Sequence, residues 1–302
     1  MPEIHDQQAT PKGILLQRAA DGSHVVAHRI EMLRLVVSLA FGLAAVLATA
    51  WPPAAVSIGV AAAAWAVLSF AILGLWSQRE TSAAALAQET LDTWLFDLPW
   101  SPSITERPLP DEELRRRARK SMLAEERMIT WYPDVSGIER AYGVLICQRE
   151  NLTWDWRLRR RYANALVGGI TAWIVLGVAI GFALDLSVRE LLIRWFVPSI
   201  AALLLAAQHA RGHREIASER ETLAARVRAE LDLADCDPLA VDDCTRLRNF
   251  SRGIQDGIYR TRKRIERVPR KLYEHHRNED EKDMRETAAD TVARLAPSRA
   301  SG

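Results

Sequence analysis

Few residues of this 302-residue chain have the types and spacing that chemistry requires. His209 and His213 lie four positions apart, so on a helix both imidazoles would share one face and could hold a metal ion. No third ligand lies nearby in the sequence and the stretch is basic, so we interpret both as histidines at a membrane surface and predict neither metal nor cofactor. The chain contains no glycine-rich phosphate loop, nucleophile elbow or CxxC pair, which favours a protein that is not an enzyme.

The most basic part of the chain is 240–271, where ten Lys and Arg stand against four Asp and Glu. Arg260, Arg262 and Arg264 would lie on different sides of a helix there. Anionic lipid could hold such a segment, with about 1 kcal/mol for each basic residue near the surface. A phosphate-bearing ligand is the alternative, because guanidinium forks match phosphate geometry. Charge alone favours lipid or solvent as the partner.

A second candidate stretch is ICQRENLTWDWRLRRRY, residues 146–162. Asp155 and Arg159 are spaced to pair on one helical face. Trp154 is amphipathic and suits the headgroup level of a bilayer. The stretch therefore predicts an anchor at the membrane surface, and both a binding site and a structural clamp are compatible with it.

The candidate residues are positioned by helices, and long uncharged runs in the sequence predict where the membrane-spanning helices lie. Residues 35–78 contain 44 consecutive positions without Asp, Glu, Lys or Arg, and one bilayer crossing needs roughly 20 apolar residues. Trp51-Pro52-Pro53 divides this run, which predicts two helices over 31–50 and 54–76.

Two further runs predict a second hairpin. Residues 163–184 are uncharged over 22 positions, which is enough for one span. Residues 191–210 supply the fourth span if Arg194 reaches the headgroups with its long side chain. We therefore predict an all-α integral membrane protein with four transmembrane helices in two hairpins and helical cytosolic segments.

Basic residues next to these spans are concentrated on one side, whereas the loop 185–190 on the other side has one Arg against two acids, which places the basic side in the cytoplasm. We expect both termini in the cytoplasm and the protein in a bacterial inner membrane. The predicted segments are an N-terminal cytosolic segment 1–30, a hairpin 31–76, a cytosolic helical insert 77–162, a second hairpin 163–210 and a cytosolic helical tail 211–302. Within the insert, Leu86, Leu91 and Leu95 lie on one side of a helix over 82–98, and Asp111 begins a charged helix that ends near Thr130.

Small residues recur at every fourth position in the predicted spans, as at Gly177 and Gly181 and around Gly59. Such positions let helices approach closely in lipid. Packing inside one four-helix unit is the favoured interpretation, and packing between copies in a homo-oligomer is the alternative. The absence of an ionisable residue in the middle of any span argues against coupled transport and favours a structural unit or a pore that forms on assembly.

Three stretches in this order, LDTWLFDLPW (91–100), WYPDVSGIERAYGVLICQRENLTWDWRLRRRY (131–162) and IQDGIYRTRKRIERVPRKLY (254–273), resemble a known family. With the arrangement of spans, the chain resembles the bacterial four-transmembrane effectors associated with SMODS nucleotidyltransferases, called S-4TM. The resemblance covers nearly the whole chain. The positions that match the family pattern are Asp92, Leu98, Pro99, Trp100, Trp131, Tyr132, Gln148, Asn151, Trp154, Asp155, Arg159, Gln255, Asp256, Arg262, Pro269 and Tyr273.

The resemblance implies a membrane effector of CBASS-like anti-phage signalling. A partner nucleotidyltransferase would make a cyclic oligonucleotide, and the effector would respond by permeabilising the membrane, with no DNA or RNA polymer involved. The candidate ligand-sensing residues are Arg159, Arg260, Arg262, Arg264, Gln255 and Asp256. The alternative is a membrane scaffold or adaptor that binds a cytosolic protein through its helical insert and tail.

Overall fold

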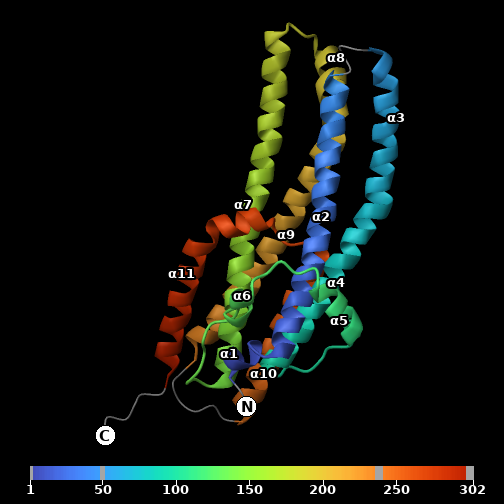
Figure 1. Ribbon diagram of the computed structural model, residues 1–302. Coiled ribbons are helices and arrows are strands. Elements are labelled where there is room, and N and C mark those ends of the chain that lie inside the picture. The colour runs from blue at the N-terminus through green and yellow to red at the C-terminus, as the bar shows by residue number, and fades with distance from the viewer. Residues whose placement is uncertain (1–2, 48–51, 235–240, 297–302) are drawn as a thin grey trace. The chain divides into compact units, whose positions relative to one another are not determined.

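The structure, a computed structural model, describes residues 3–47, 52–234 and 241–296, and every regular element in these residues is a helix (Figure 1). The predicted all-α class is thus confirmed for the described residues. The predicted turn at Trp51 and the end of the predicted first span lie outside them. The helices are α1 (Ile4–Gln8), α2 (Pro11–Leu47), α3 (Pro52–Leu68), α4 (Gly74–Phe96), α5 (Asp111–Ala118), α6 (Glu125–Ile129), α7 (Arg140–Ala183), α8 (Val188–Leu191), α9 (Val197–Asp232), α10 (Val241–Arg264) and α11 (Arg270–Leu295), with π-helical segments η2 (Ser69–Leu73) and η3 (Leu192–Phe196).

The chain divides into two compact units. Unit 1 comprises 1–26, 80–158 and 216–302, and unit 2 comprises 27–79 and 159–215. The boundaries fall inside helices, so α2, α4, α7 and α9 each contribute residues to both units.

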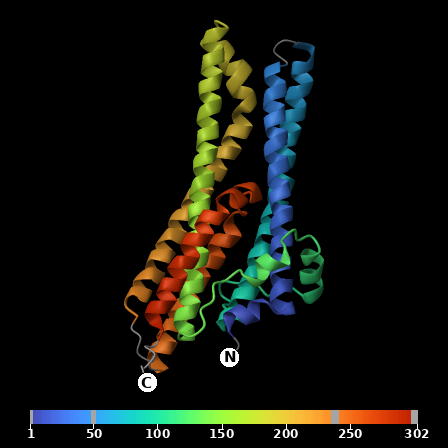
Figure 2. The same cartoon turned by 60° about the vertical axis from the view of Figure 1, so that its left-hand side comes forward.

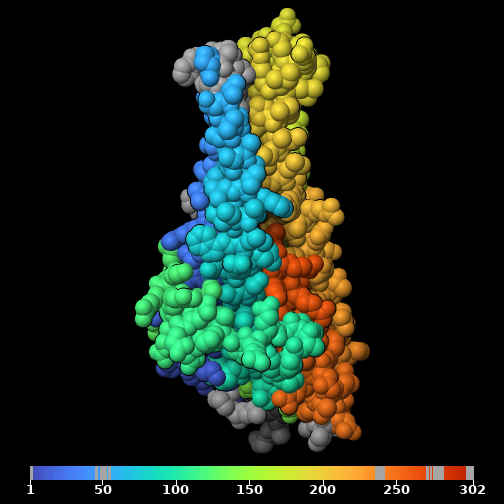
Figure 3. All heavy atoms as spheres, turned by 90° about the vertical axis from the view of Figure 1, so that its right-hand side faces the viewer, coloured from blue at the N-terminus to red at the C-terminus, as the bar shows by residue number. Residues whose placement is uncertain are grey.

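Unit 2 exposes large apolar side chains along its helices. Val56 is 75% exposed, Phe70 79% and Phe182 84%, which in water would be costly and in lipid is the ordinary state. Figure 3 shows the face along α3 and the start of α4, and the exposed side chains of these helices include Val56 and Leu75. Three helical stretches are long and apolar enough to cross a membrane, namely Val56–Phe96, Arg140–Ala183 and Val188–Asp232. The predicted first span lies on α2, and the count of four spans stays a prediction.

Small residues and tryptophans pack the helices of unit 2 against one another. A Cβ on Gly177 would lie 2.3 Å from Nε1 of Trp195, so only glycine permits α7 and η3 to lie this close. Trp195 stacks on Trp173 with ring centroids 4.7 Å apart, and Trp173 Nε1 donates to Ser199 Oγ at 3.1 Å. Gly181 meets Leu191 in the same hairpin.

Polar side chains also join the helices of unit 2. Glu31 on α2 accepts two hydrogen bonds from Arg34 Nη1 at 2.8 Å, and His209 on α9 lies 3.4 Å from the same carboxylate. Arg34 Nε donates to Ser69 Oγ at the start of η2. These contacts tie α2, η2 and α9 together at one level of the unit.

Unit 1 is built on the apolar faces of α4, α7 and α10. Leu91 and Leu95 of α4, Leu145 of α7 and Ile254 of α10 are at most 3% exposed, in one core cluster. Leu91 and Leu95 of the helix expected over 82–98 therefore supply this core, whereas Leu86 packs in a separate cluster with Tyr259. Figure 2 shows α10 and α11 alongside the first half of α7, and Arg149 of α7 donates to Thr291 of α11 at 3.3 Å.

One expectation about unit 1 was wrong in detail. The helix predicted from Asp111 to near Thr130 is broken into α5 and α6, because Ser121 and the backbone amide of Met122 donate to Asp21 of α2 at 2.7 and 2.9 Å. These tertiary bonds outweigh the local helical preference. Helix α2 also begins at Pro11, so most of the N-terminal segment is part of the core of unit 1. A Cβ at Gly22 would lie 2.1 Å from the carbonyl oxygen of Arg117, so any residue other than glycine at this position would clash with the backbone.

Candidate functional site

A buried network of charged side chains lies in unit 1, centred on Asp92 of α4. Oδ2 of Asp92 accepts from Arg262 Nη1 at 2.6 Å and from Gln255 Nε2 at 3.0 Å, both on α10. Oδ1 accepts from the hydroxyl of Tyr132 at 2.6 Å. Asp92 is 2% exposed and Arg262 6%, so this ion pair is out of contact with bulk water.

A second acid–base pair adjoins the first. Glu89, one helical turn before Asp92, is fully buried and accepts from Arg252 at 2.6 Å and from Gln255 at 2.8 Å. Arg252 also donates to Asp256 at 2.7 Å. Gln255 thus donates to both carboxylates of α4, which is the geometry of a bridge between two ion pairs.

The network carries an odd number of charges. Three carboxylates (Glu89, Asp92, Asp256) face two guanidinium groups (Arg252, Arg262), a formal sum of 2 − 3 = −1. Burial raises the pKa of Glu89, against the opposing effect of Arg252. Burial by itself would lower the pKa of Arg262, but the charge of Asp92 outweighs it and the pKa is raised, so this guanidinium stays charged.

Neutral side chains fix the network to other elements. Gln148 of α7 donates to the carbonyl oxygen of Ser251 at 3.0 Å and to Gln255 Oε1 at 3.2 Å. Gln8 of α1 exchanges two hydrogen bonds with the backbone of Tyr132, at 2.9 and 3.2 Å. Burial and the charge of Asp92 raise the pKa of Tyr132 well above 10.0, so the phenol remains a proton donor to Asp92.

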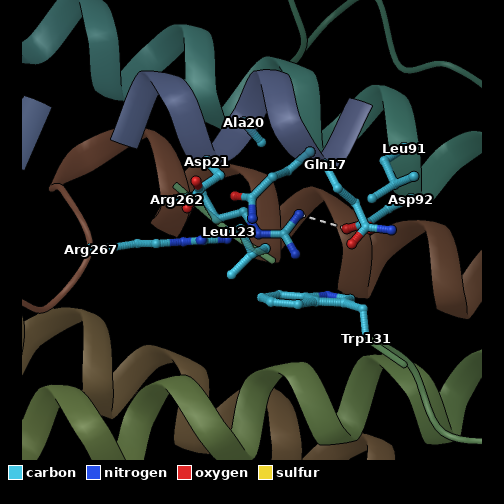
Figure 4. A pocket seen from close by; sticks show the side chains of 10 residues that line it. Gln17, Ala20, Asp21, Leu91, Asp92, Leu123, Trp131, Arg262 and Arg267 are labelled. Carbon is cyan, nitrogen blue, oxygen red and sulfur yellow. Dashed lines mark hydrogen bonds and ion pairs between the residues drawn. The ribbon is translucent and has the colours of Figure 1, made fainter. Parts of the chain in front are cut away.

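A pocket opens beside this network, and Figure 4 shows its lining. The ring of Trp131 forms one side, and the guanidinium of Arg262 lies across from it with its bond to Asp92. Arg267, in the non-helical link between α10 and α11, lies 5.5 Å from the centre of the Trp131 ring. The remaining lining residues are Gln17, Ala20, Asp21, Gln88, Leu91 and Leu123.

The structure brings together six of the predicted residues, three of which were candidate sensors (Gln255, Asp256 and Arg262). The other three sensors lie elsewhere. Arg260 and Arg264 are exposed on α10, and Arg264 pairs with Glu219. Arg159 belongs to unit 2, where it is 2% exposed with Nη1 3.0 Å from Nδ1 of His213. The three network residues that came from the family pattern are Asp92, Tyr132 and Gln148.

The other residues of the family pattern have structural surroundings. The carbonyl of Pro99 accepts from Arg252, and Trp100 packs on a small cluster with Tyr259. Asp155 pairs with the buried Arg220 of α9 at 3.0 Å. Trp131 lines the pocket, Asn151 and Trp154 are half-buried on α7, and Pro269 precedes α11, whereas the side chain of Tyr273 lies outside the described residues.

Sequence reasoning missed Glu89, Arg252, Gln17 and Asp21. A signal existed for the first two, because Glu89 and Asp92 are polar positions three apart in a helix that is otherwise apolar on that side, and Arg252 and Asp256 are four apart. No such signal exists for Gln17 and Asp21, since the pattern of 1–30 predicts nothing about their neighbours.

The exposed apolar helices of unit 2 are those of a membrane protein, and unit 1 contains a buried polar site. The chain belongs to the SMODS-associating 4TM effector domain family, which it matches over residues 2–291. It is similar to a probable CBASS effector molecule of Bacillus cereus (strain VD146), with 24% identity over 201 residues. The aligned part covers 66% of this chain and 66% of that protein. No solved structure matches the chain. The resemblance seen in the sequence is thus confirmed, and these findings support an anti-phage effector role.

Proposed function

We propose that this protein is an inner-membrane effector of a cyclic-oligonucleotide-based anti-phage system, which permeabilises the membrane on a nucleotide signal. The observation that carries the proposal is that α2, α4, α7 and α9 each contribute to both units. A rigid helix transmits rotation along its axis, so a ligand that shifts these helices in unit 1 acts on their continuations in unit 2.

Sensing is assigned to the network and pocket of unit 1. This site combines an aromatic face, two arginines and several amides in a concave place, which is the usual composition of a nucleotide site. The messenger comes from a partner nucleotidyltransferase, in keeping with the family and with the name of the Bacillus cereus relative. Membrane permeabilisation and oligomerisation are assigned to unit 2, with its exposed apolar faces in lipid and both termini in the cytoplasm.

The direct test is leakage of a trapped dye from liposomes that contain the purified protein. We expect at least one cyclic oligonucleotide from a panel to trigger leakage, and the linear form of the same nucleotide to fail. Co-expression with a nucleotidyltransferase that makes the active nucleotide should reproduce the effect as growth arrest.

The alternative, a scaffold or adaptor, predicts a different outcome. No nucleotide would cause leakage, and a cytosolic protein would bind the insert or tail with the membrane intact. Absence of leakage with every member of the panel, from a protein shown to be folded and inserted, would refute the effector proposal in favour of this one.

A further inference from the structure

The pocket of unit 1 contains hydrogen-bonding atoms that the protein itself does not use. Gln17 of α2 is 7% exposed, and its Nε2 donates to the carbonyl oxygen of Met128 at 3.0 Å. Its Oε1 is buried and receives no hydrogen bond from any described residue. A buried acceptor without a donor carries a free-energy cost, so its presence in a pocket wall points to a ligand that donates.

Asp21, one turn further along α2, presents a second acceptor. Its Oδ2 accepts from Ser121 Oγ at 2.7 Å and from the amide of Met122 at 2.9 Å. These bonds hold the carboxylate in place, and its Oδ1 accepts nothing from the described residues. Figure 4 shows Asp21 and Gln17 on the same side of the pocket, opposite the ring of Trp131.

Arg262 supplies donors to the same space. Its guanidinium has five N–H groups, and the hydrogen bond within the described residues uses Nη1 on Asp92. Because Asp92 already neutralises the charge, Arg262 is better suited to the neutral acceptors of a base than to a phosphate. Arg267, half-buried over Trp131 in the non-helical link 265–269, is the cation placed to meet a phosphate at the mouth.

The geometry points to this pocket as the site of one guanine base of a guanine-containing cyclic nucleotide, an inference that rests on the proposed function. The base stacks on Trp131 by displacing Arg267, which lies 5.5 Å from the ring centre and leaves no room for a base between them. Arg262 donates to O6 and N7, as arginine does to guanine elsewhere. The N1–H and N2–H groups donate to Asp21 and to the unpaired oxygen of Gln17.

Guanine fits this set of groups better than the other bases. It offers two neighbouring acceptors and two neighbouring donors, whereas adenine has one exocyclic amine and would leave Gln17 or Asp21 unpaired. One base of a cyclic dinucleotide would enter the pocket, with the remainder outside the mouth.

The test compares two probes on the full-length protein in lipid nanodiscs. We expect 3′,3′-cyclic di-GMP to bind on the order of 10-fold or more tightly than 3′,3′-cyclic di-AMP by calorimetry. In Asp21→Asn an amide N–H replaces one acceptor, so the preference for guanosine monophosphate over xanthosine monophosphate, measured by competition, should fall or reverse. Ser121→Ala is the matched control, because it removes a partner of Asp21 and leaves the carboxylate.

The results separate this inference from the proposed function. Equal binding of the two cyclic dinucleotides, or an Asp21→Asn variant with unchanged base preference, overturns the guanine assignment even if nucleotides still trigger leakage. The same loss in Ser121→Ala as in Asp21→Asn would show that Asp21 acts only on the fold. A folded protein that binds neither probe also overturns the assignment, while leakage caused by another nucleotide would leave the effector function standing.

Discussion

Arg262 and Arg264 lie two residues apart on α10 and have opposite surroundings. Arg262 is buried on Asp92, whereas Arg264 is 46% exposed beside Glu219. Charge reversal of Arg262 leaves Asp92 buried against a like charge, so Arg262→Glu should destabilise unit 1 by about 3–5 kcal/mol, while Arg264→Glu should cost well under 1 kcal/mol. Thermal unfolding of the two single variants in detergent measures the difference. Similar melting temperatures would show that the ion pair to Asp92 is not buried in solution.

Glu150 gives a pH-dependent contribution to stability. Burial raises its pKa from 4.5 to about 7, against the opposing effect of Arg149. Because the folded-state pKa is the higher one, the folded state holds the proton between these values. The contribution is therefore full below pH 4.5 and is lost as the pH rises to 7, by about 3 kcal/mol in total.

The variant Glu150→Gln should remove this dependence. It keeps a neutral side chain at all pH values, and Arg149 retains its bond to Thr291. Melting temperatures at pH 5.5 and 8 should then differ less in the variant than in the wild type, with the variant more stable at pH 8. An equal pH dependence in both proteins would assign the effect to other groups.

At the scale of the helices, two glycines distinguish packing within a chain from packing between chains. Gly177 faces Trp195, whereas a Cβ on Gly59 of α3 would meet nothing within 4 Å. We expect Gly177→Leu to disrupt the second hairpin and lower the yield of folded protein. Gly59→Leu should leave the fold intact and reduce oligomer formation and leakage, because leucine prevents close approach of a second copy. Cross-linking in nanodiscs checks this, and unchanged oligomers in Gly59→Leu would mean that this face contacts lipid.

The sequence predicted the elements better than their partners. Uncharged runs and leucine spacing located the long helices, because burial in lipid or core requires those patterns. The ion pair of Asp92 with Arg262 joins residues 170 positions apart, and no local pattern encodes such a contact. The break between α5 and α6 was missed for the same reason, since Asp21 lies 100 positions before Ser121.

At the scale of the whole molecule, the predicted orientation can be measured directly. Reporter fusions after Ala118, at Asp185 and at the C-terminus should report cytoplasm, periplasm and cytoplasm, because basic residues flank the spans on the side of the termini. Asp185 lies in the turn between α7 and α8, with a positive φ of 51°, in a link short enough to accept only a hairpin. A cytoplasmic signal at Asp185 would contradict the four-span arrangement.

The π-helical segments η2 and η3 each place one extra residue in a helical turn, one segment in each hairpin. A π turn holds one residue more than an α turn. The position of a π turn can shift along a helix when one backbone hydrogen bond is exchanged for the next. Each step turns the intervening residue by about 100° around the axis, from the helical repeat of 3.6 residues. Ser69 and Trp195, which hold contacts to Arg34 and Trp173, lie within these segments. The hairpins can therefore change which side chains they present to their neighbours without unfolding and without sliding across the bilayer.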